Sequence, residues 1–349
     1  MDMPPNSSGN TVLWEVVEEH LAESETLLLA LGRAFDSPTL TLAQLERDVE
    51  ARLAAHLDAL ALGGAPVYEG LLQPLLSEPD PDQPGRLAAA AMVALDRRRF
   101  ADLSPALCHE AAVVRTAAVN ACALRGDKGI EDWVLARCRD VSDARERASL
   151  LGVIARRGLE PPPLIEWLQG EDALLAAAAA KAVRRADPRR HLPVIEYLLD
   201  HPDEDVRESA LVAALAWGSH RASAVCEGWA LDSRKPRWLP MALSAALGGA
   251  RQHEGLARKI SLPEHRAGAL FALGFSGNPE VLPVLLERLS DPAPLIAKIA
   301  AQSVSTIVGI DLHHEAFIAA ESPPAATLDA SPSPPSTDEG DVPPTPEDA

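Results

Sequence analysis

The residues best suited to contact a partner are tryptophans and cations gathered between positions 217 and 238. The stretch "DSRKPRW" (232–238) joins three cations to one tryptophan in a chain with only 4% aromatic residues. Trp and Arg carry much of the binding energy at protein interfaces. We predict a partner-binding site made of Trp217, Trp229, Arg234, Lys235, Arg237 and Trp238. The alternative is that these tryptophans fill volume that alanines leave between helices.

Histidine followed by glutamate, a pair of metal-ligating residue types, occurs three times, at His109-Glu110, His253-Glu254 and His314-Glu315. The first pair stands six residues before Arg115, whereas the second stands thirteen before Arg266. Pairs at unequal places in a repeat do not converge on one metal. We predict no metal site and no cofactor, and interpret these residues as exposed helix ends.

Composition and motifs limit the classes of function. GxxxxGK[ST], GxGxxG, GxSxG and HExxH are absent, so nucleotide chemistry is not indicated. A formal charge of −19 disfavours nucleic acid and anionic membranes, which need clustered cations. We expect a cytoplasmic chain, because neither a signal peptide nor an apolar run of bilayer length is present. Four cysteines without CxxC spacing predict reduced, mostly buried thiols.

A repeat of about 30 residues organises positions 86 to 309. A basic residue precedes a glycine by eleven positions six times, from Arg115–Gly126 to Lys298–Gly309. We call the first residue of each of these six pairs a slot residue. Two further positions fit the same spacing, and the resulting eight slot residues lie 29 to 32 residues apart. These slot residues are Arg86, Arg115, Arg147, Ala176, Arg207, Arg237, Arg266 and Lys298.

Each repeat has the pattern of a helix pair. An apolar stretch such as "HLPVIEYLLD" (191–200) precedes each slot, and a small residue usually stands three positions after it. The closing glycine suits the left-handed position that ends a helix. We predict an all-α solenoid with at least seven helix pairs between about Tyr68 and Leu312.

The segment "LLDHPDEDVRESALVAALAWG" (198–218) carries an Asp-Pro turn and a second helix that opens with Val-Arg. This pattern resembles HEAT repeats, and the resemblance covers roughly residues 68 to 312. It implies a HEAT-like α-α superhelix in which slot arginines pair with aspartates in a ladder. Arg115, Arg147 and Arg207 are then structural; the alternative is an anion-binding stripe.

The two ends of the chain depart from the repeat. Thr41 and Gln44 predict a capping box for a second N-terminal helix after "DSP" (36–38). Residues 321–349 hold eight prolines and seven acidic residues, which predicts disorder. We therefore divide the chain into a disordered N-terminus (1–10), an N-terminal helical cap (11–67), a HEAT-like solenoid (68–320) and a disordered acidic tail (321–349).

The opening "VVEEHLAESETLLLALGRAF" (16–35), paired with residues 45–69, is similar to an uncharacterised bacterial HEAT-repeat family with some genes near type VI secretion loci. We predict a non-enzymatic scaffold or adaptor that binds a protein partner, as an accessory to such a system. HEAT-like folds also include alkylpurine DNA glycosylases and the di-iron hydroxylase that modifies deoxyhypusine. A HEAT-like enzyme of either kind is the alternative.

Overall fold

The computed structural model describes residues 12–34, 41–231 and 237–310. These residues contain helices and no β-strand, and they belong to one compact unit that ends at Ile310. The all-α prediction is confirmed, as expected for a sequence rich in alanine and leucine. None of the described helices could cross a bilayer. The predicted disordered ends, 1–10 and 321–349, lie outside the described residues.

The N-terminal cap begins with α1 (Trp14–Ala34). The backbone N–H of Gln44 donates to Thr41 Oγ1 over 3.2 Å, and the backbone N–H of Thr41 donates to Gln44 Oε1 over 2.9 Å. This confirms the predicted capping box at the start of α2 (Leu42–Leu45). A π-helical segment at 46–50 then continues the chain into α3 (Ala51–Leu62), which packs along α1.

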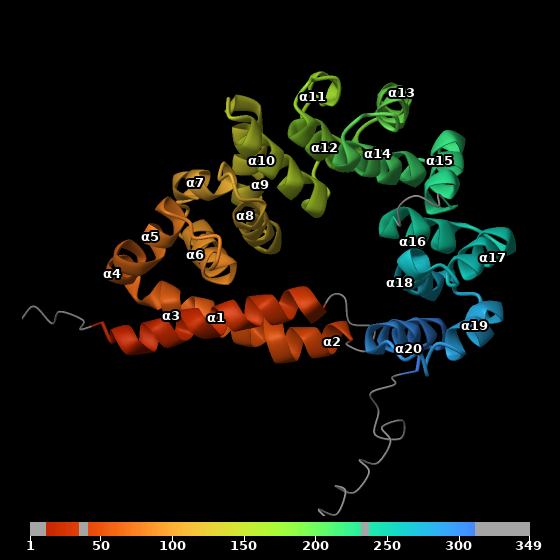
Figure 1. The fold of residues 1–349 in the computed structure, drawn as a ribbon. Helices are drawn as coiled ribbons and strands as arrows, with labels where there is room; N and C mark the ends of the chain where they lie inside the picture. The colour runs from red at the N-terminus through yellow and green to blue at the C-terminus, as the bar shows by residue number, and fades with distance from the viewer. Residues whose placement is uncertain (1–11, 35–40, 232–236, 311–349) are drawn as a thin grey trace, which may run out of the picture. The chain divides into compact units, whose positions relative to one another are not determined.

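Eight helix pairs follow, and in each pair the first helix packs on the second (Figure 1). The first helices are α4 (Gly64–Val67) with α5 (Gln73–Ser77), α7 (Ser104–Leu107), α9 (Lys128–Asp140), α11 (Ile165–Leu168), α13 (Pro188–Leu198), α15 (His220–Leu231), α17 (Ala250–Lys259) and α19 (Leu282–Leu286). The second helices are α6 (Pro84–Asp96), α8 (Ala112–Leu124), α10 (Ala144–Arg157), α12 (Ala173–Ala182), α14 (Glu204–Ala216), α16 (Trp238–Leu247), α18 (Pro263–Leu273) and α20 (Pro294–Val308). The HEAT-like solenoid predicted from the repeat is therefore present.

Small residues let consecutive second helices approach closely. Ala118, Ala179 and Ala210, each three positions after a slot, are completely buried. Slot residues stand at the fourth position of most second helices, as Arg207 does in α14. Lys298 is one position late, and Ala300 is accordingly the buried alanine of α20. The repeat spacing thus located the second helices to within a few residues.

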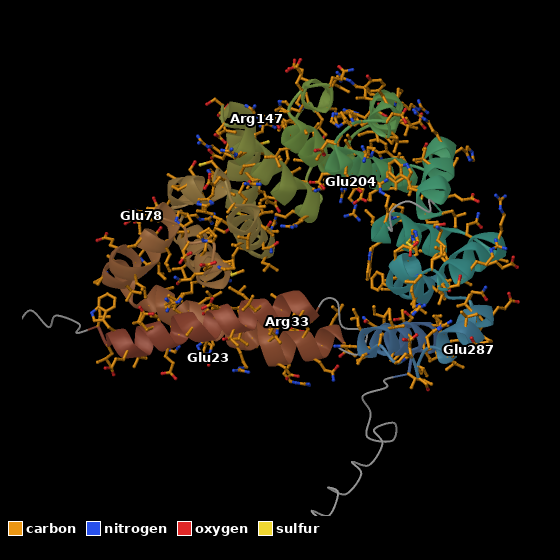
Figure 2. The ribbon with its side chains drawn as sticks, in the orientation of Figure 1. Glu23, Arg33, Glu78, Arg147, Glu204 and Glu287 are labelled. Atoms are coloured by element: carbon orange, nitrogen blue, oxygen red, sulfur yellow. The ribbon has the colours of Figure 1, made fainter. Side chains whose placement is uncertain are left out.

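The slot arginines bind the turn between the two helices of their own repeat. Arg115 Nη1 donates to the carbonyl oxygens of His109 and Glu110, both over 2.6 Å. Arg207 repeats this arrangement, and Arg147, labelled in Figure 2, donates to the carbonyl of Val141. The structural interpretation of these residues is right. The Asp–Arg ladder implied by the resemblance is wrong for these three, because backbone carbonyls occupy their guanidinium groups.

Two other slot arginines do reach neighbouring repeats. Arg266 Nη1 lies 3.9 Å from the buried carboxylate of Asp291. Arg237 departs further from the pattern, since it is the N-cap residue of α16 and its Nη2 pairs with Glu204 Oε1 over 2.7 Å. Inter-repeat ion pairs therefore exist, but only at some repeats of the described solenoid.

The closing glycines fall into two groups. Gly158, Gly218, Gly277 and Gly309 have φ between +59° and +75°, as predicted for residues that end a helix in the left-handed region. Gly126 and Gly248 lack a positive φ, so the prediction is wrong there. At Gly248 the chain leaves the helix in an extended conformation.

Replacing Gly158 with alanine should lower the free energy of unfolding by about 1 kcal/mol, because alanine is strained at positive φ. A Cβ at Gly158 would meet no atom nearer than 3.9 Å, so the cost is conformational rather than steric. Urea titration measures it. Gly158→Asn is the matched control, since asparagine tolerates this region better. Equal losses in the two variants would contradict this explanation.

The row of second helices is interrupted between α14 and α16. All other consecutive second helices pack closely, whereas these two make little contact. The buried core divides near the same place, with one cluster reaching Cys226 and the other starting at Ala230. The solenoid therefore has two packed parts that meet at this joint.

Candidate functional site

A groove runs along the side chains of α8, α10, α12 and α14 and continues to α16. It consists of two cavities with volumes of about 690 and 780 Å³. Both cavities are lined by Ala155, Lys181, Arg184 and Asp205, which makes them one continuous space. We call this space the central groove. The volume of each of its two cavities is within the range of ligand-binding pockets.

Alanine and glycine form the floor of the central groove. Ala148, Gly152 and Ala177 come from α10 and α12, and Ala213 and Ala216 continue the floor on α14. These small side chains leave no bulk above the helices. The Ala-rich sequence of α12 therefore produces both the packing and the groove.

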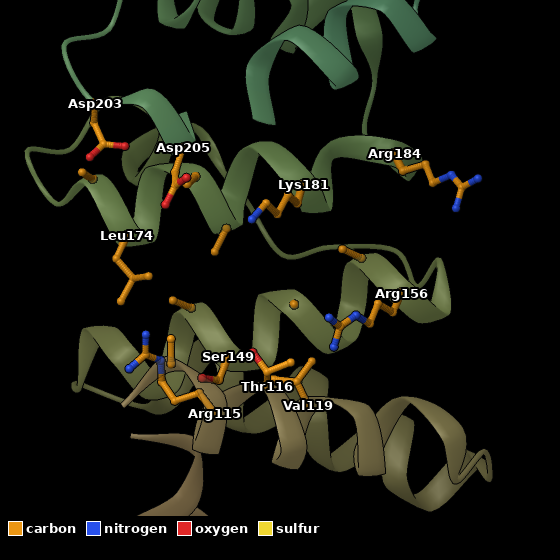
Figure 3. Close-up of a pocket in the computed structure, with 17 residues that line it drawn as sticks. Arg115, Thr116, Val119, Ser149, Arg156, Leu174, Lys181, Arg184, Asp203 and Asp205 are labelled. Atoms are coloured by element: carbon orange, nitrogen blue, oxygen red, sulfur yellow. The ribbon is translucent and has the colours of Figure 1, made fainter. Parts of the chain in front are cut away.

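Four cations line the first cavity: Arg115, Arg156, Lys181 and Arg184. Arg115 is held by backbone carbonyls, and Arg156 Nη1 donates to Asn120 Oδ1 over 2.6 Å. Lys181 and Arg184 are exposed and make no ion pair with any described residue. Figure 3 shows Arg156 and Lys181 projecting from neighbouring helices beside the same cavity. The C-terminal ends of α10 and α12 thus carry positive charge without a carboxylate to neutralise it.

Carboxylates lie at the N-terminal end of α14. Asp203 caps this helix by accepting the backbone N–H of Val206 over 3.1 Å, and Asp205 lines both cavities. Glu208 lines the second cavity and is half-buried. Burial raises the pKa of Glu208; Glu204 and Asp205 raise it further, and the positive charges of Arg237 and Arg207 oppose the shift. The central groove therefore has a basic region near Lys181 and an acidic region near Asp205.

The structure brings together only part of the predicted tryptophan site. The guanidinium carbon of Arg237 lies 4.4 Å from the ring centroid of Trp229. Trp238 is 46% exposed, and its ring centroid lies 5.5 Å from that of Phe271. Trp217 lines the second cavity of the central groove beside Leu239. Within the described chain, no two of these tryptophans stack on each other.

Arg234 and Lys235 lie outside the described residues, so the predicted partner site stays a prediction. The contacts of Arg237 within the fold are sufficient to give it a stabilising role without any binding partner. Its side chain lies over Trp229 and pairs with Glu204. An arginine held in this way loses little further freedom on binding.

Two of the three His-Glu pairs are described. His109 Nδ1 accepts the backbone N–H of Ala111 over 3.0 Å. His253 is 5% exposed, and its Nε2 lies 2.9 Å from the carbonyl oxygen of Ala245. The prediction of an exposed helix end is therefore wrong for His253, which joins α17 to α16 of the preceding repeat. His314 and Glu315 lie outside the described residues, and no group of three metal-ligating side chains occurs in the described part.

The cysteines follow the prediction made from their spacing. Cys122, Cys138 and Cys226 are buried, Cys108 is partly buried, and all four are free thiols. Burial raises the pKa of Cys122 to about 12, which keeps this thiol protonated and unreactive at neutral pH.

The site predicted from the sequence does not include Arg156, Lys181 or Arg184. A usable signal was present, because each follows a slot by five to nine positions, near the end of a second helix. Basic residues at helix C-termini are common, since they complement the helix dipole. The sequence alone did not distinguish these cations from Arg157, which is paired with Glu131 over 2.5 Å.

Comparison with known proteins gives little beyond the fold. No family model matches the chain, and no curated protein matches it. The chain is similar to the solved structure of human deoxyhypusine hydroxylase in complex with glycerol, at 17% sequence identity and a TM-score of 0.30. The match covers 85% of this chain and 99% of the hydroxylase chain. A likeness at this level carries no argument about the ligands or reactions of this chain.

The comparison does correct one prediction. We inferred a non-enzymatic scaffold from a helical-repeat architecture and the absence of catalytic motifs. The solved protein named above is an enzyme. A helical-repeat fold does not by itself specify whether a protein is an enzyme, and the scaffold interpretation is withdrawn. The resemblance to a bacterial family and its link to secretion loci stay predictions.

Proposed function

We propose that the protein binds a small anionic ligand in the central groove. The observation that carries the proposal is the pair Lys181 and Arg184. Both are exposed, line the two cavities of the groove, and have no ion-pair partner among the described residues. A guanidinium and an ammonium group above an apolar floor bind phosphate or carboxylate through charge-assisted hydrogen bonds.

The net charge favours a small ligand over a polymer. A long polyanion would experience the repulsive field of a chain with net charge −19. A small anion responds mainly to the nearby cations, because salt screens charges beyond about 10 Å. The carboxylates of Asp205 and Glu208 on the other side of the groove also limit the length of a continuous anionic ligand.

Reversing both charges in Lys181→Glu/Arg184→Glu should weaken binding of inorganic pyrophosphate at least about tenfold, because two charge-assisted hydrogen bonds become repulsive contacts. Isothermal titration calorimetry at low salt measures the affinity. Arg139→Glu/Arg145→Glu changes the net charge equally at exposed residues outside the groove. Equal losses in the two double variants, or no binding by the parent protein, would reject the proposal.

Acid–base chemistry is a second candidate, favoured by Glu208. A half-buried carboxyl group with a raised pKa beside a cation-lined cavity is the arrangement that general acids use. Glu208 and Lys181 line the same cavity, and Glu208 makes no hydrogen bond with another described residue. No described residue therefore competes with a groove ligand for a hydrogen bond to the Glu208 carboxyl.

The raised pKa of Glu208 gives a test that needs no substrate. Below the pKa that Glu208 has in the unfolded chain, its carboxyl is neutral in both the folded and the unfolded state. The contribution of Glu208 to stability is fully present in that pH range. Because the folded pKa is higher, that contribution is lost as the pH rises through it. Glu208→Gln should thus leave the melting temperature unchanged near pH 4 and raise it near pH 7. A pH-independent difference between variant and parent would refute the shift.

A further inference from the structure

A second groove lies between α1, α6 and α8, with a volume of about 490 Å³. Leu28, Leu29 and Gly32 of α1 form one side, and Val113 and Leu124 of α8 form the other. We call it the apolar groove. Its volume falls within the range of ligand pockets, and it does not depend on the joint between α14 and α16.

The apolar groove leaves large apolar side chains exposed. Leu29, Val113 and Leu124 are 49%, 44% and 43% exposed. Exposed apolar side chains gathered in one depression are typical of binding sites. Their burial by a ligand would release water from all three.

One charged residue, Arg156, lines the apolar groove. Arg156 also lines the central groove, so the two spaces meet at its side chain. Its Nη1 donates to the neutral amide oxygen of Asn120 over 2.6 Å. The guanidinium charge at the end of the apolar groove is therefore not neutralised by this contact.

We propose that the apolar groove binds the alkyl chain of a linear carboxylate, with the carboxylate on Arg156. The proposal names a ligand class for the anion-binding function and depends on that function for its charged group. The apolar side chains of α1 and α8 cover the hydrocarbon, and Arg156 fixes the ligand's direction. A neutral alcohol of the same length lacks the group that Arg156 binds.

Gly32 offers a variant that fills the groove without disturbing the fold. A Cβ at Gly32 meets no atom within 4 Å, so a leucine there extends into open space. Leucine is also favoured over glycine in a helix. Gly228→Leu is the matched control, because Gly228 has equally open surroundings on α15 and does not line either groove.

Titration calorimetry with octanoate, decanoate and dodecanoate, below their micelle concentrations, tests the proposal. Affinity should rise about threefold per methylene added and exceed that for dodecanol. Gly32→Leu should remove the dependence on chain length, whereas Gly228→Leu should keep it. Arg156→Gln should weaken carboxylate binding about tenfold.

Pyrophosphate separates the two proposals, because it occupies only the charged site. If pyrophosphate binds as proposed but affinity does not depend on chain length, or Gly32→Leu leaves that dependence intact, the alkyl-chain inference is overturned alone. If the parent protein does not bind pyrophosphate, the anion-binding function is rejected, and the alkyl-chain inference that depends on it is overturned as well. Retained pyrophosphate binding in Gly32→Leu, with loss of the chain-length effect, supports both.

Discussion

Arg137→Ala is expected to lower the free energy of unfolding by about 3 kcal/mol, the lower end for a broken buried ion pair. Arg137 Nε and Nη2 donate to Glu146 Oε1 and Oε2 over 2.7 and 2.9 Å. Glu146 is 3% exposed, in the first turn of α10. Removing the arginine leaves a carboxylate buried without its partner, and this desolvation cost dominates the loss.

Urea denaturation measures this loss, with two controls. Arg47→Ala breaks an ion pair with Asp48 in which both side chains are largely exposed, so its cost should be much smaller than that of Arg137→Ala. Arg137→Met/Glu146→Leu removes both charges and should recover much of the stability. If Arg137→Ala lowers the free energy of unfolding no more than Arg47→Ala does, leaving the buried Glu146 carboxylate unpaired does not destabilise the fold, and the explanation is wrong.

Arg207→Ala should cost about 2 kcal/mol, because charge-assisted hydrogen bonds contribute about 1.5 to 3 kcal/mol each and these are partly open to solvent. Arg207 Nη1 donates to the carbonyl oxygens of His201 and Pro202 over 2.6 and 2.7 Å. These carbonyls belong to the turn between α13 and α14. Without the hydrogen bonds of Arg207, the angle between α13 and α14 is less firmly held.

Thermal and urea unfolding of Arg207→Ala are compared with those of Arg221→Ala. Arg221 pairs with Asp200 over 2.5 Å, with both side chains substantially exposed, so its replacement should cost less. Arg207→Lys should lie between the parent and Arg207→Ala, since an ammonium group cannot reproduce the guanidinium geometry. Equal stability of Arg207→Ala and Arg221→Ala would mean that the slot arginine does not stabilise the repeat.

The sequence by itself determined the helical architecture. The spacing of the slot residues located the second helices, and Thr41 with Gln44 located the start of α2. These features are local: a capping box, a left-handed glycine and the contacts of a slot arginine each involve residues within about one or two helical turns. Local chemistry of this kind can be predicted without knowing what packs against it.

Tertiary structure decided which partner each side chain meets. Arg115 and Arg207 bind carbonyls of their own repeat, whereas Arg237 pairs with Glu204, 33 residues away. The slot pattern makes these arginines look equivalent, but the N-cap position of Arg237 turns its side chain toward the preceding repeat. A shift of three or four residues is about one helical turn, which moves the side chain about 5 Å along the helix and so changes its neighbour.

The grooves also belong to the tertiary structure. Lys181 and Arg157 both lie near the C-terminal ends of second helices, yet Arg157 meets Glu131 and Lys181 meets no carboxylate of the described chain. Small residues such as Ala177 predict close packing, but a groove exists only where several such helices lie side by side. The sequence specifies each helix face, and only the packing of α8, α10, α12 and α14 determines which charges remain over an open floor.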